Sequence, residues 1–73
     1  MKRLAIAKHL TNDEYTLLLN TYANHNRSMG LKERTKYNLS DIIKVVRNKK
    51  ENCLDVHYKN GDWWHYCANG TWY

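Results

Sequence analysis

The first third of the chain carries apolar residues with the period of an α-helix. They recur at spacings of three and four residues, which places them on one helical face: Tyr15, Leu18, Leu19, Tyr22 and Ala23. This pattern predicts a helix over residues 12–28. We expect a short turn of helix over residues 3–9 before it.

Local signals mark both ends of this helix. Thr11 and Glu14 have the spacing of a capping box, in which each side chain binds the backbone N–H of the other residue. Leu10 and Tyr15 have the spacing of a hydrophobic staple. Gly30 suits the left-handed conformation that often follows the last turn of a helix.

The last third of the chain has the composition and turn residues of β-strands. Segments rich in β-branched and aromatic residues are separated by Asn-Gly pairs, which favour hairpin turns. The expected strands are residues 42–47, 53–58, 62–67 and 71–73. The pairs Asn60-Gly61 and Asn69-Gly70 then use the same hairpin chemistry twice.

The register between the second and third strands follows from the turn at residues 60–61. With two residues in the turn, the pairs expected to face the helix are Tyr58–Trp63, Val56–His65 and Leu54–Cys67. The pairs expected on the opposite, partly wet face are Asp55–Tyr66 and His57–Trp64. The expected fold class is α+β, with one amphipathic helix packed on a short antiparallel β-meander of three or four strands.

The length of 73 residues allows a single small domain. Its parts are a helical region at about 1–30, a basic link at 31–40 and the β-meander at 41–73. The link is compatible with either helix or extended chain. A domain of this size buries only about 60% of its unfolded surface, so a deep enzymatic cleft is not expected.

The charge of the chain is concentrated in its middle. The formal net charge is +5, from 12 Lys and Arg against seven Asp and Glu. Residues 27–51 hold eight of the cations and only three of the acids. Such a segment favours an acidic protein surface or a phosphate backbone as partner.

The sequence predicts neither a membrane span nor a secretion signal. It has no apolar run near 18 residues. Its basic start is followed by only four apolar residues, which is too short for a signal peptide. We therefore expect a cytoplasmic protein, in which the two cysteines are free thiols.

Four residues have the chemistry of zinc ligands: Cys53, His57, His65 and Cys67. The expected register places Cys67 and His65 toward the helix and the other two on the opposite face. It therefore disfavours both a zinc site and a Cys53–Cys67 disulfide. We expect the cysteines to act as small side chains that fill space in the packed interior, and we expect no metal or other cofactor.

The sequence gives little support for catalysis. No Ser, Cys or Thr stands in a nucleophile motif, and there is no Gly-rich phosphate loop. His9 and His25 flank the predicted helix and are expected at the surface. We therefore expect a protein that is not an enzyme.

Two kinds of binding remain open. Cations with exposed aromatic rings, such as Trp64, Trp72 and Tyr73, suit single-stranded nucleic acid. Trp, Tyr and Arg are also the residues that dominate protein interfaces. In either case the candidate partner-binding residues are Lys32, Arg34, Lys36, Lys44, Arg47, Lys49, Lys50, Trp64 and Trp72.

The whole chain resembles a known family in outline. The similarity lies in Leu10-Thr11-Asn12-Asp13-Glu14-Tyr15, the basic middle, Asn60-Gly61-Asp62-Trp63-Trp64-His65-Tyr66 and Asn69-Gly70-Thr71-Trp72-Tyr73. These segments resemble small bacteriophage transcription regulators and antiterminators of the Xanthomonas phage type, which bind host RNA polymerase.

The resemblance implies a monomer that acts in the cytoplasm of a bacterial host. It implies docking on the N-terminal segment of the β′ subunit of host RNA polymerase, inhibition of transcription initiation, and antitermination in which NusA takes part. The alternatives are a small basic module for single-stranded nucleic acid and an inhibitor of a bacterial defence nuclease.

Overall fold

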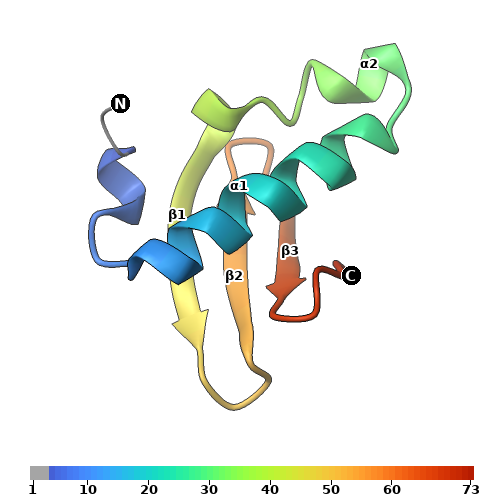
Figure 1. The fold of residues 1–73 in the computed structure, drawn as a ribbon. Helices are drawn as coiled ribbons and strands as arrows, with labels where there is room; N and C mark the ends of the chain where they lie inside the picture. The colour runs from blue at the N-terminus through green and yellow to red at the C-terminus, as the bar shows by residue number, and fades with distance from the viewer. Residues whose placement is uncertain (1–3) are drawn as a thin grey trace.

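One long helix crosses one face of a three-stranded antiparallel sheet (Figure 1). The structure is a computed structural model that describes residues 4–73. The strands are β1 (Ile42–Asn48), β2 (Cys53–Tyr58) and β3 (Trp63–Cys67), in the order β1-β2-β3. The predicted α+β class is confirmed.

The helices are η1 (Ala5–Ala7), α1 (Asn12–Arg27), α2 (Leu31–Arg34) and η2 (Leu39–Asp41). The predicted turn before the main helix corresponds to η1, although residue 3 lies outside the described part. The link at 31–40 contains α2 and the start of η2. The expected fourth strand at 71–73 is not formed, and Trp72 makes only an isolated bridge to Tyr66.

The first turn of α1 is stabilised by the predicted capping box. Thr11 Oγ1 accepts a hydrogen bond from the backbone N–H of Glu14 at 3.1 Å, and Glu14 Oε1 accepts one from the N–H of Thr11 at 2.8 Å. Glu14 also pairs with Arg47 of β1, whose Nη2 lies 2.6 Å from Glu14 Oε1. The Arg47 hydrogen bonds lower the pKa of Glu14 to about 2.

The last turn of α1 ends differently from the prediction. Gly30 has an ordinary φ of −68° and is not a left-handed cap. Instead, the guanidinium of Arg34 donates to the carbonyls of Asn26, Met29 and Arg27, each at 3.1 Å. A cation on the last carbonyls of a helix is favourable because the C-terminus of a helix carries partial negative charge.

The helical period of α1 was predicted correctly, but its buried face is rotated. The buried residues are Leu18, Thr21 and His25, whereas Ala23 is exposed. His25 is only 3% exposed, so its expected surface position is wrong. The apolar pattern does not indicate this rotation, because Thr21 and His25 are polar residues that are nevertheless buried.

The register of β3 is shifted by one residue from the prediction. Tyr66 pairs with Leu54, and Trp64 pairs with Val56, so Trp64 and Tyr66 face the helix. The turn has three residues, because Gly61 N–H donates to Tyr58 O and Tyr58 N–H donates to Asp62 O. Of the pair Asn60-Gly61, only Gly61 has positive φ, whereas the two-residue turn requires it at both positions.

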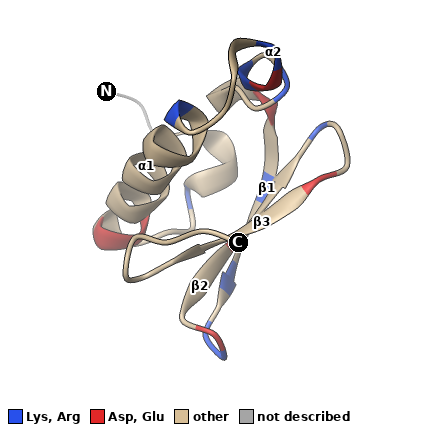
Figure 2. Ribbon diagram, turned by 90° about the vertical axis from the view of Figure 1, so that its right-hand side faces the viewer, with Lys and Arg blue, Asp and Glu red and all other residues tan. Residues whose placement is uncertain are grey.

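The core lies between α1 and the inner face of the sheet. Its buried members include Leu10, Leu18, Tyr37, Ile42, Val45, Leu54, Val56, Tyr58 and Tyr66. None of the helices formed by residues 4–73 lies on the opposite face of the sheet (Figure 2). We call this side of the sheet, turned away from α1, the outer face.

Candidate functional site

The outer face carries a row of side chains across all three strands. Lys44 of β1 pairs with His57 of β2, which pairs with Trp63 of β3. The rings of His57 and Trp63 are stacked, with centroids 5.6 Å apart and planes inclined by 15°. Trp63 nevertheless remains 51% exposed. A large ring held by a neighbour and open to solvent is suited to contact with a partner.

A second row lies beside the first. Asp55 pairs with His65 across β2 and β3, and Tyr73 lies beside His65, joined to it by backbone hydrogen bonds of 2.8 and 3.1 Å. The ring centroid of His65 lies 4.8 Å from that of Trp63 and 4.6 Å from that of Tyr73. His57, Trp63, His65 and Tyr73 therefore form one continuous aromatic surface, which we call the aromatic row.

Two carboxylates adjoin the aromatic row. His65 Nδ1 lies 2.8 Å from Asp55 Oδ1 and 3.6 Å from Glu51 Oε2. The hydroxyl of Tyr73 donates to Glu51 Oε2 at 3.2 Å. Partial loss of hydration, followed by this hydrogen bond to Glu51, raises the pKa of Tyr73. This end of the outer face is therefore polar and acidic.

The two cysteines also lie on the outer face. Cys53 and Cys67 are directly opposite each other, with their Cα atoms 4.0 Å apart, and they are joined by a disulfide. The expectation of free thiols pointing apart is therefore wrong. The side chains were predicted to point apart because of the one-residue register error, since a slip of one residue turns every side chain of a strand to the other face. The free thiols were predicted from an expected reducing cytoplasm.

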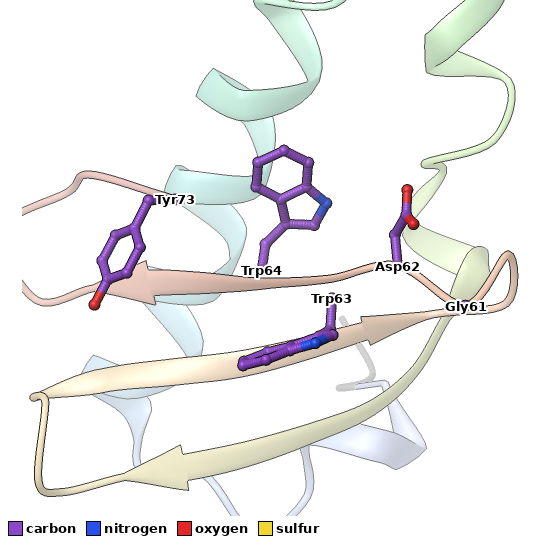
Figure 3. A pocket seen from close by; sticks show the side chains of 5 residues that line it. All are labelled: Gly61, Asp62, Trp63, Trp64 and Tyr73. Atoms are coloured by element: carbon purple, nitrogen blue, oxygen red, sulfur yellow. The ribbon is translucent and has the colours of Figure 1, made fainter.

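A shallow hollow lies at the β2–β3 turn, beside the exposed ring of Trp63. It is lined by Gly61, Asp62, Trp63, Trp64 and Tyr73 (Figure 3). Trp63 and Trp64 leave β3 on opposite sides, and Trp64 points toward α1. The hollow is open, so it is suited to a side chain or ring of a partner rather than to an enclosed substrate.

The tryptophans named from the sequence as exposed anchors are not on this face. Trp64 and Trp72 are half-buried and pack against the core. Their ring centroids lie 4.5 and 5.4 Å from that of buried His25. The expected exposure of Trp64 is wrong, and Trp63 takes its place at the surface.

The candidate cations do not form one patch. Lys32, Arg34 and Lys36 are in or just after α2, whereas Lys49 and Lys50 are in the β1–β2 turn at the opposite end of the molecule (Figure 2). Arg34 and Arg47 are engaged within the fold, as described above. Of the seven, Lys44 alone takes part in the rows that cross the outer face.

A buried polar chain connects α1 to the sheet beneath the candidate site. His25 Nδ1 lies 2.9 Å from the hydroxyl of Tyr66, which lies 2.6 Å from that of Tyr58. Burial lowers the pKa of His25, raises that of Tyr58 to about 12 and raises that of Tyr66 as well. These groups are uncharged at neutral pH and hold the sheet in place.

Comparison with known proteins gives no match: no family model, curated protein or solved structure is similar to the chain. In the described part of the chain, every helix is too short or too polar to cross a membrane.

Proposed function

We propose that the chain is a docking module without enzymatic activity that binds a larger protein through the outer face of its sheet. The observation that carries this proposal is the aromatic row. Trp63 and Tyr73 are 51% and 60% exposed, yet neighbouring rings hold both in position. Ordered aromatic side chains lose little conformational entropy on binding and are frequent at the centre of protein interfaces.

Charge on the outer face favours a protein over a nucleic acid as partner. Asp55 and Glu51 lie at the aromatic row, where a phosphate backbone would meet like charge. Apart from Lys44 and Arg47 of β1, the candidate cations are divided between the two ends of the molecule. Single-strand binding proteins instead combine stacking rings with a basic groove that follows the backbone.

We propose bacterial RNA polymerase as the partner. This choice is supported by the resemblance of the whole chain to phage regulators that bind this enzyme and redirect it from initiation to antitermination. In the same proposal the β′ subunit presents the docking surface, NusA assists antitermination, and the chain acts as a monomer in the host cytoplasm.

The test is size-exclusion chromatography of the chain with RNA polymerase core enzyme, without nucleic acid and at near-physiological salt. We expect co-elution with the polymerase of the matching host. The Trp63→Ala variant should lose it, because truncation of a central aromatic residue commonly costs 2 kcal/mol or more, roughly 30-fold in affinity. Leu31→Ala is the matched control, since Leu31 is 80% exposed but belongs to α2.

Each outcome discriminates between the proposals. Free elution with every polymerase tried would remove RNA polymerase as the partner. Equal co-elution of Trp63→Ala and Leu31→Ala would remove the outer face as the docking surface. Binding to single-stranded DNA or RNA instead would establish the nucleic-acid alternative. Binding to a defence nuclease would establish the inhibitor alternative.

A further inference from the structure

The corrected register brings metal-ligand side chains together on the outer face. Cys53 and Cys67 face each other across β2 and β3, and His65 lies two residues before Cys67 on the same face. Glu51 stands two residues before Cys53. The ligand atoms of Glu51, Cys53 and His65 all lie within 4.8 Å of one another. Cys67 Sγ is bonded to Cys53 Sγ, so it belongs to the same cluster.

We propose that the reduced chain binds one zinc ion through Cys53, Cys67, His65 and Glu51. Two thiolates, one imidazole and one carboxylate complete the four-coordinate shell that structural zinc prefers. Reduction of the disulfide frees both sulfurs. The oxidised chain therefore holds the disulfide, and the reduced chain can bind the metal. The redox state of the surroundings determines which of the two forms is present.

Distances in the cluster are close to those of a tetrahedral site. With zinc–sulfur and zinc–nitrogen bonds of about 2.3 and 2.0 Å, neighbouring ligand atoms stand about 3.3 to 3.8 Å apart. His65 Nδ1 and Glu51 Oε2 are already 3.6 Å apart. The two sulfurs must separate, which rotation about their Cα–Cβ bonds provides without a change in strand pairing.

Surrounding groups hold two of these ligands in place. The Tyr73 hydroxyl donates to Glu51 Oε2, and the Tyr73 ring lies against His65. Cys53 and Cys67 are buried, at 5% and 9% exposed, so the thiolates would be shielded from water. Partners that orient ligands in this way raise metal affinity by about 10- to 100-fold.

Reduction of the disulfide and binding of zinc can be written as balanced steps, with a phosphine as the reductant. Phosphorus gives two electrons to the S–S bond, and water supplies two protons to the sulfurs and its oxygen to the phosphine oxide. Zinc then displaces both thiol protons. At His65 the metal takes the Nδ1 position that faces Asp55, and the ring proton moves to Nε2.

The experiment titrates the full chain with Co²⁺, a spectroscopic substitute for zinc, before and after phosphine reduction. We expect the reduced chain to bind one ion per chain, with thiolate-to-cobalt charge-transfer bands and the visible bands of a tetrahedral site. Zinc should then displace the cobalt. The oxidised chain should show neither band.

Two histidine variants provide the matched comparison. His65→Asn should weaken cobalt binding at least about tenfold, whereas His57→Asn, on the same face but outside the cluster, should bind as the original chain does. The proposal is overturned if the reduced chain binds no cobalt, if the bands lack thiolate character, or if the two variants bind equally. The comparison of oxidised and reduced original chain decides the matter even if a variant fails to fold.

Discussion

His25 is a residue whose burial could not be predicted from the sequence. A polar side chain on a helix is expected in water, and nothing near His25 in the sequence indicates otherwise. Its partner, Tyr66, is 41 residues away. The hydrogen bond that makes burial acceptable thus exists only once α1 lies on the sheet. Thr11 and Glu14, by contrast, are three residues apart, and their mutual capping was predictable from sequence.

Burial of His25 predicts loss of stability in mild acid. Its pKa is lowered in the folded chain, so the unfolded chain binds the proton more strongly. The stabilisation is complete above the unfolded pKa of about 6.5 and is lost as the pH falls below it. Denaturant titrations between pH 7 and 5 should show a falling midpoint. The Arg47-paired Glu14, whose pKa is about 2, responds at lower pH.

The His25→Gln variant is the control for this prediction. It keeps a side chain able to bond with Tyr66 but does not titrate in this range. Its midpoint should therefore change less between pH 7 and 5 than that of the original chain. Equal slopes for the two chains would contradict the assignment, whatever the absolute stability of the variant.

At the scale of the elements, a turn decided which face each side chain of β3 occupies. The sequence predicted all three strands nearly to their ends, because composition and alternation are local signals. An Asn-Gly pair, however, fits a two-residue turn and also a three-residue turn with glycine in third place. The structure uses the latter at both Gly61 and Gly70. This one-residue difference exchanged Trp63 with Trp64 and brought the cysteines together.

Two glycines offer a matched test of this turn. Gly61 has φ of +92°, whereas Gly30 has an ordinary φ, and a Cβ would meet nothing within 4 Å at either. Gly61→Ala should lower the free energy of unfolding by about 1–2 kcal/mol, from backbone strain alone. Gly30→Ala should change it by less than about 0.5 kcal/mol. Equal effects in thermal or denaturant unfolding would contradict the left-handed turn.

At the scale of the whole molecule, the basic middle of the sequence is divided in space. Lys32 and Lys36 lie at the α2 end, and Lys49 and Lys50 lie at the β1–β2 turn (Figure 2). Neighbours in sequence are separated because β1 runs the length of the sheet between them. The net charge was readable from composition, but its distribution depends on the path of the chain.

This division predicts a modest effect of charge reversal on docking. Lys49→Glu with Lys50→Glu, or Lys32→Glu with Lys36→Glu, should slow association with the polymerase but preserve the complex. Charges at the rim of an interface mainly affect association rates. Kinetic binding measurements at two salt concentrations would check this. Loss of the complex with either pair would show that the docking surface lies elsewhere. Retention of full binding to single strands would oppose a phosphate-binding role for these lysines.

Other parts of the chain lie along both edges of the sheet, beside β1 and beside β3. Beside β1, His9 Nε2 donates to Val45 O at 2.8 Å, and η1 packs against the strand. Beside β3, residues 71–73 return to bond with Cys67 and His65. Amyloid fibrils grow where a strand edge accepts another chain. With both margins engaged, the folded protein should resist fibril formation at high concentration.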